Sequence, residues 1–291
     1  MKTRWAVLSV LWVAILMFWW PPVMAALNLG LRDERYGQID AAPFLIIFLL
    51  FWERNRVFTA AASNIGAGIS LVLLALCTYF AFLARPSYTV EDIRFPLAVF
   101  LAAVAWMGAF ICCFGLRSFR AAWFPFCCLF LMIPVPPRLI NGLTAVLQHG
   151  SAAVSCQMLR LAGVPVFAEG MRMMLPGLQI DIAPECSGIH SFLALGLVAL
   201  LGGRLCLQFG WSQIGLVVCT IPIAIFKNAV RISVIAWLGA YVDRAVLNGN
   251  IHHYGGLVFT PLAVVMLVAL LMTLKKSETR IAQQSVNRQQ V

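Results

Sequence analysis

The sequence predicts an all-α polytopic membrane protein with about eight transmembrane helices, an outer interfacial helix and a small β-hairpin. Of its 291 residues, 62% are hydrophobic and 11% are charged, and the mean hydropathy is +0.90. Soluble domains are about 25% charged. These values exclude a soluble globular protein, a disordered chain and a disulfide-rich secreted domain. At about 20 residues per span, the length accommodates roughly eight membrane helices.

Apolar runs mark the expected spans in order. The first, Trp5–Leu27, is interpreted as a retained span because Trp19–Pro22 is a poor signal-peptide cleavage site. The second, Ala42–Trp52, is short, so it either begins near Ile39 or is partly buried in protein. The remaining six spans are expected at Val57–Leu83, Phe95–Leu116, Ala121–Val135, Ile189–Leu205, Ile214–Phe226 and Leu257–Leu274.

We therefore expect one membrane domain over residues 1–274, with N-terminal spans at 5–135 and a second half at 136–274. Residues 275–291 are polar and basic, which predicts a disordered cytoplasmic tail.

Basic residues are unequally distributed between the two predicted sides. With the N-terminus inside, the inner loops and tail contain the acids Glu53 and Glu278 and a larger set of basic residues. These are Lys2, Arg4, Arg54, Arg56, Arg117, Arg120, Arg204, Lys275, Lys276, Arg280 and Arg288. This excess in short inner loops follows the positive-inside rule. It predicts that both termini are cytoplasmic and that residues 136–187 and 228–256 face outward. The net charge of +10 then reports orientation and suggests no nucleic-acid partner.

The longest outer segment contains two predicted elements. Phe130–Pro137 ends a span with prolines, which cannot continue a helix. Leu139–Leu161 has helical apolar spacing with interleaved polar residues, which favours an amphipathic interfacial helix. A ninth span is the alternative.

Arg172–Ile182 then predicts a β-hairpin with Pro176 and Gly177 in its turn. In an extended strand, Gln179 and Asp181 share one face.

One of the nine cysteines differs from the rest. Cys186, followed by Ser187 and Gly188, directly precedes an apolar helix on the outer side. A helix N-terminus lowers a thiol pKa, and its N–H groups can stabilise an oxyanion. The alternatives are a buried apolar cysteine or a disulfide with Cys156. No CxxC or Cys/His spacing indicates zinc.

Two further clusters lie near predicted helix ends on the outer side. Lys227 is predicted to snorkel, whereas Asn228 and Arg231 can share a helix face and bind a carbonyl oxygen or a carboxylate. A snorkelling arginine is the alternative. His252 and His253 precede the last span and suit proton transfer near neutral pH, or form a polar interfacial belt. A thiol, a guanidinium and an imidazole together make a complete acyl-transfer set.

These segments resemble the exosortase/archaeosortase family. The resemblance covers about residues 123–265 and is carried by Phe130–Pro137, Pro184–Ile189, Asn228–Arg231 and His252–Phe259. It implies a membrane-embedded cysteine protease or transpeptidase of the cytoplasmic membrane. Its partners would be exported proteins with a C-terminal sorting signal: a short motif such as Pro-Glu-Pro, a membrane helix and a basic tail. The other partners would be the lipid bilayer and an acceptor nucleophile of unknown identity, with no cofactor or metal.

Carried over by position, the resemblance implies Cys186 as nucleophile, Arg231 as the arginine and His252 as the histidine. The family's histidine usually stands four residues before a glycine that opens the final span; Gly256 selects His252, and His253 remains an alternative. Further candidates for substrate or oxyanion contacts are Asn228, Ser187, Gly188, His190 and His253. His190 departs from the family pattern, in which many relatives have arginine or another residue.

Two other classes compete with this interpretation. A transporter or exopolysaccharide-export component needs charged residues along a pathway near the membrane midplane, whereas the notable ones here are predicted at helix ends. A membrane metalloprotease needs ligands at helical spacing such as HExxH, which the four histidines do not provide.

Overall fold

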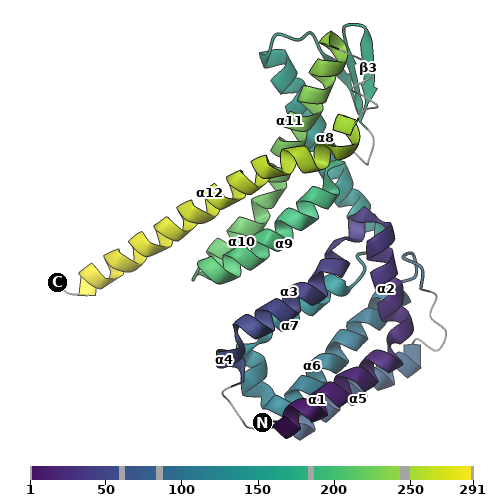
Figure 1. The fold of residues 1–291 in the computed structure, drawn as a ribbon, viewed down its shortest axis with the longest axis vertical. Helices are drawn as coiled ribbons and strands as arrows, with labels where there is room; N and C mark the ends of the chain where they lie inside the picture. The colour runs from purple at the N-terminus through teal and green to yellow at the C-terminus, as the bar shows by residue number, and fades with distance from the viewer. Residues whose placement is uncertain (1, 59–62, 83–87, 183–186, 243–249, 290–291) are drawn as a thin grey trace. The chain divides into compact units, whose positions relative to one another are not determined.

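A computed structural model describes residues 2–58, 63–82, 88–182, 187–242 and 250–289; the side chains of residues 2, 250–257 and 285–289 are outside the description. The chain divides into two compact units, Met1–Ile140 and Asn141–Val291. Unit 1 is helical, and unit 2 combines helices with a small sheet (Figure 1).

Unit 1 begins with a sharp bend in the first apolar run. The sequence predicts one span there, but α1 and α2 meet at 77°. The bend follows from Pro21 and Pro22 in the first turn of α2, where proline fits best because those N–H groups have no helical acceptor. The helices of unit 1 are α1 (Lys2–Phe18), α2 (Trp20–Arg32), η1 (Glu34–Tyr36), α3 (Gln38–Trp52), α4 (Arg54–Val57), α5 (Ile65–Phe82), α6 (Arg94–Ala121), α7 (Trp123–Cys127) and η2 (Cys128–Met132).

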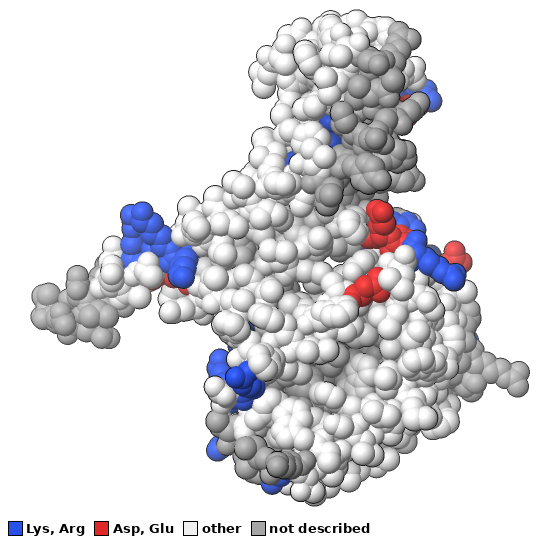
Figure 2. Space-filling model, viewed as in Figure 1, with Lys and Arg blue, Asp and Glu red and all other residues white. Residues whose placement is uncertain are grey.

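Several basic segments of unit 1 meet at one end. The ring of Trp5 lies 4.6 Å from Phe58 and 5.2 Å from Phe114, so the start of α1, the residue after α4 and the last third of α6 converge. These segments, together with α4 itself, contain Arg4, Arg54, Arg56, Arg117 and Arg120. Figure 2 shows charged side chains gathered in a few places beside broad uncharged surface.

Five described helices are long and apolar enough to cross a membrane, or up to seven spans if each of two bent pairs is one span. The predicted polytopic all-α membrane class is therefore confirmed, with fewer clear spans than the eight expected. The second predicted span accounts for part of the difference, because α3 has 15 residues, whereas a span needs about 20. The five helices are Ile65–Phe82, Arg94–Ala121, Ile189–Cys206, Gly210–Tyr241 and Val258–Gln284; the bent pairs are Thr3–Phe18 with Trp20–Arg32 and Trp123–Met132 with Pro137–Leu161.

Unit 2 contains the predicted hairpin. Strands β2 and β3 pair antiparallel, with Leu175 opposite Leu178 across the Pro176–Gly177 turn, and β1 adds to the other side of β2. The elements are α8 (Pro137–Leu161, which begins in unit 1), β1 (Phe167–Glu169), β2 (Arg172–Leu175), β3 (Leu178–Asp181), α9 (Ile189–Cys206), α10 (Gly210–Val218), α11 (Thr220–Tyr241) and α12 (Asn250–Gln289).

Two helices of unit 2 continue beyond their predicted ends. The seventh span was expected to stop at Phe226, but α11 reaches Tyr241, so the placement of Lys227, Asn228 and Arg231 at a helix end was wrong. Hydropathy falls at these residues, but tertiary packing buries them within the helix. Likewise α12 is helical to Gln289, although disorder was predicted from residue 275.

Glu278 accounts for the order of the polar part of α12. Its side chain is buried, and its carboxylate accepts hydrogen bonds from the backbone N–H groups of Gln208 (2.8 Å) and Phe209 (3.1 Å). These residues directly precede α10, whose first N–H groups have no helical acceptor. A carboxylate at a helix N-terminus also interacts favourably with the helix dipole. The tail is thus fastened to the turn between α9 and α10.

We expect Glu278→Ala to destabilise unit 2, because two backbone N–H groups lose a buried acceptor. Loss of a capping group costs about 1–2 kcal/mol. The thermal midpoint of the detergent-solubilised protein should fall by several degrees. The exposed neighbour Ser277 provides the control, and Ser277→Ala should leave the midpoint unchanged. Equal midpoints for the two variants would contradict the fastening role.

Candidate active site

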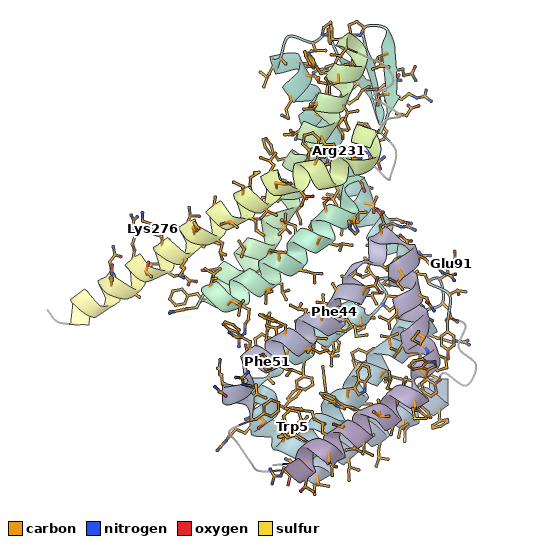
Figure 3. All side chains as sticks on the ribbon, in the orientation of Figure 1. Trp5, Phe44, Phe51, Glu91, Arg231 and Lys276 are labelled. Carbon is orange, nitrogen blue, oxygen red and sulfur yellow. The ribbon has the colours of Figure 1, made fainter. Side chains whose placement is uncertain are left out.

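Three packed helices of unit 2 bring together the segments that contain the predicted site residues. Helix α9 follows the Cys-Ser-Gly segment, α11 contains Asn228 and Arg231, and α12 begins two residues before His252. Each of these helices contacts the other two. Figure 3 shows Arg231 in the part of α11 that the start of α12 passes. The apolar cluster that joins them with α10 consists of Leu195, Ala199, Leu207, Leu216, Ile223, Ala263 and Leu267.

The start of α9 lies directly against α11. Gly188 caps α9 with φ +76°, a left-handed conformation that favours glycine. A Cβ atom on Gly188 would lie 3.2 Å from Cγ and 3.3 Å from Oδ1 of Asn228, which is fully buried. Ser187 is also buried, and its Oγ accepts a hydrogen bond from the Ile189 N–H at 3.4 Å. Both the backbone conformation and the close approach therefore require glycine here. Cys186 lies outside the described residues.

One turn into α9, a second contact with α11 involves a buried lysine. Lys227 is 1% exposed, and its Nζ donates to Oγ of Ser191 at 2.8 Å. The prediction that Lys227 snorkels to the membrane surface was therefore wrong: a hydroxyl of the neighbouring helix binds the ammonium group inside the bundle. A charged group in a membrane-spanning segment is costly unless it has such partners.

These two contacts fix how α9 and α11 lie together. The helices run in opposite directions (Figure 1), with Ser191 beside Lys227 and Gly188 beside Asn228. Arg231 lies three residues beyond Asn228 on the same helix face. Because the two helices run in opposite directions, this part of α11 lies towards the start of α9. Its side chain is 9% exposed. A buried arginine and a buried amide thus lie close to Ser187 and Gly188.

The sheet anchors the chain on the other side of this turn. The Ile182 N–H donates to the Met171 carbonyl at 2.9 Å, and the Ile182 carbonyl accepts a hydrogen bond from the side-chain amide of Gln148 in α8. Ile182 also belongs to a buried cluster that joins the sheet, α8 and α11, where Ile232 and Ala236 are members. The chain is therefore anchored at Ile182 and again at Ser187, on either side of the nucleophile candidate.

The other predicted site residues are less fully described. His252 and His253 lie in the first turn of α12, with side chains outside the description. His190 is exposed in the first turn of α9. Cys156, considered as a disulfide partner for Cys186, is a free thiol in the buried cluster of unit 2.

Two residues that position the site, Ser191 and Gln148, were not predicted from the sequence. Ser191 carries no distinguishing local signal. Gln148 is one of several polar residues in the predicted amphipathic helix. Only its contact with Ile182 in the folded chain distinguishes it from the others.

A groove of about 700 Å³ lies in unit 1. It is lined mostly by apolar side chains of α1, α5 and α6, with Thr3, Arg4 and Ser63 among the lining residues, and it includes none of the predicted site residues. In the part of the chain that the structure describes, no group of three His, Cys, Asp or Glu side chains is arranged to hold a metal ion.

A family model described as transmembrane exosortase matches residues 19–269, well over half of the chain. The chain belongs to the transmembrane exosortase family. The match confirms the resemblance drawn from the sequence, and its range includes the Cys-Ser-Gly segment, Asn228, Arg231 and both histidines of α12. A search of curated proteins and a search of solved structures return no significant match.

We expect Gly188→Ala to damage the site of this exosortase-family protein. A Cβ atom would force a left-handed backbone on alanine and press against Asn228, at a cost of about 1–3 kcal/mol. Thermal unfolding in detergent measures the effect. The matched control is Gly196→Ala in the same helix, where a Cβ meets nothing within 4 Å. That variant should be neutral or up to about 1 kcal/mol more stable. Similar effects at both glycines would contradict the close packing at Gly188.

Proposed function

We propose that this protein is a membrane-embedded cysteine protease or transpeptidase. It cleaves the C-terminal sorting signals of exported proteins at the outer face of the cytoplasmic membrane, within the half of the chain formed by residues 136–274. One observation carries the proposal: the Ser187–Gly188 turn is packed against Asn228, one helical turn from the buried Arg231. This arrangement offers a nucleophile position, a hydrogen-bonding amide and a cation in one place.

The first half of the reaction forms an acyl-enzyme. His252 accepts the thiol proton of Cys186, and the dipole of α9 favours the resulting thiolate. The thiolate attacks the scissile carbonyl carbon, and the carbonyl electrons move to oxygen. Arg231, with Asn228 or backbone N–H groups at the start of α9, stabilises that oxyanion. The C–N bond then breaks as His252 returns its proton to the departing amine. The departing product contains the membrane helix and basic tail of the signal.

The second half releases the exported protein. An acceptor amine or a water molecule attacks the thioester carbonyl, and His252 accepts the proton of the attacking group. The C–S bond breaks, which regenerates the Cys186 thiolate and leaves the substrate joined to the acceptor or as a free acid. Both outcomes share the same acyl-enzyme, so the choice depends on the acceptor.

The orientation belongs to the same proposal. Both termini are cytoplasmic, and the active site faces the periplasm or cell exterior. The clustering of basic residues at one end of unit 1 and the exposed Lys275, Lys276 and Arg280 on α12 support this arrangement.

A transporter or export component is the competing function. Lys227 and Arg231 lie within α11 and not at its end, so helix-end placement no longer distinguishes them from charges along a transport pathway. Lys227, however, is almost fully buried and donates to a hydroxyl of the neighbouring helix. Such a contact is expected of packed helices, whereas a transport pathway places its ionisable groups in a water-lined cavity. The enzyme is therefore the better-supported function.

Trapping the acyl-enzyme tests the nucleophile. Incubation of the purified protein with a tagged sorting-signal substrate should produce an adduct on the peptide containing Cys186, detectable by mass spectrometry and released by hydroxylamine. Cys186→Ala should abolish both the adduct and the processing. Cys156→Ser, at a buried thiol in the same unit, is the control and should keep both. Processing by Cys186→Ala at the wild-type rate would overturn the assignment.

Separate substitution of the two histidines tests the general acid and base. We expect His252→Gln to lower kcat by about 10²- to 10⁴-fold, the usual contribution of general acid–base catalysis, and His253→Gln to lower it far less. Steady-state processing rates measure the difference. The reverse order would transfer the role to His253, and unchanged rates for both would remove histidine from the mechanism.

A further inference from the structure

The sheet of unit 2 has an edge whose backbone groups pair with no other described strand, beside the segment that leads to Cys186. In an antiparallel ladder, opposing pairs alternate between those that exchange N–H···O bonds and those that do not. Ile182 is opposite Met171 and donates to its carbonyl, so this is a hydrogen-bonded pair. Ile180 and Leu178 therefore also bond to β2, and the N–H and C=O groups of Gln179 and Asp181 point away from it.

In the described part of the chain, β3 pairs only with β2, so nothing described extends the sheet beyond Gln179 and Asp181. Both residues are exposed, and the Asp181 side chain is 64% exposed in its ion pair with Arg172. The opposite face is anchored, because Leu178 and Ile180 pack against the cluster shared with α8 and α11. The strand is therefore fixed on one side. On its outer edge, two alternate residues have backbone donors and acceptors that no described strand pairs with, which is the arrangement that an added strand requires.

The place of this edge in the chain suggests its ligand. Strand β3 continues through Ile182 directly to the segment that contains Cys186. A carbonyl inside an α-helix already accepts a backbone hydrogen bond and is shielded by its own turn. The chain that flanks a scissile bond must therefore be extended to reach a nucleophile. Strand addition holds extended peptides by main-chain hydrogen bonds, with alternate side chains left to set specificity.

We propose that the edge of β3 binds the extended segment of the exported protein beside the scissile bond, as a fourth strand hydrogen-bonded to Gln179 and Asp181. This inference rests on the proposed function and names its substrate-binding surface. Alternate substrate side chains would lie over the exposed face of the sheet, beside Gln179 and the Arg172–Asp181 ion pair. Most of the binding would come from backbone groups, so the surface would tolerate many sequences and require an extended conformation.

Proline substitution tests the edge without breaking the sheet. Gln179→Pro removes one outward N–H and no ladder bond, which is the position where strands accept proline. We expect KM for a sorting-signal substrate to rise about 3- to 10-fold, as for loss of one hydrogen bond, with kcat changed less than about twofold. The control is Ala168→Pro on β1. Ala168 is opposite Met173, whose backbone faces β3, so the Ala168 N–H points outward at the other edge of the sheet. Its KM should be unchanged.

A second measurement separates loss of the edge hydrogen bond from a folding defect in Gln179→Pro. In the wild-type protein, a substrate with an ester in place of the peptide bond that donates to β3 should show a similar rise in KM. In Gln179→Pro the ester should raise KM further by a similar factor, because proline removes the donor on β3 whereas the ester removes the donor on the substrate. Equal KM values for wild type and both proline variants, or equal rises in both variants, would overturn the β3 assignment. Absence of Cys186-dependent processing in the wild type would instead overturn the proposed function, so the two failures are distinguishable.

Discussion

The arrangement of the site depends on the close contact between the start of α9 and the middle of α11. Gly188 in a left-handed conformation lets the chain pass within van der Waals distance of Asn228, and Lys227 binds Ser191 one turn further into α9. Without a strong hydrophobic drive between helices in lipid, close approach at small residues and interhelical hydrogen bonds determine which helices associate. This contact brings the buried Arg231 within one helical turn of the residue that Gly188 contacts.

The sheet and the tail complete this arrangement from two sides. The sheet packs on α8 and α11 and delivers the chain to the turn at Ile182, which is bound both by the ladder and by Gln148. At the other end of unit 2, Glu278 accepts hydrogen bonds from the backbone before α10. Because α12 also contains both candidate histidines in its first turn, that distant carboxylate helps to restrain the helix on which they lie.

Much of this could be predicted from local signals. The hairpin at Arg172–Ile182 followed from a Pro-Gly turn between alternating apolar residues, and the structure contains it. The start of a helix after Cys-Ser-Gly followed from an abrupt change in hydropathy. The predicted ends of α11 and α12 were wrong for the same reason. Hydropathy falls at Lys227 and at Lys275, but a helix continues wherever neighbouring elements satisfy its polar groups. Ser191 and Gln208, which provide those contacts, are distant in sequence and have no pattern of their own.

The sequence by itself determined the membrane class, the hairpin and the identity of the family, because hydropathy, turn chemistry and motif order are properties of short segments. It also singled out Cys186, Arg231 and the histidine pair as residue types suited to acyl transfer. Only the tertiary structure decided that Lys227, Asn228 and Arg231 are buried within a helix, that Gly188 lies against Asn228, and that the backbone of Gln179 and Asp181 points outward. Those properties arise from contacts between segments far apart in the chain, whose free energies no local pattern contains.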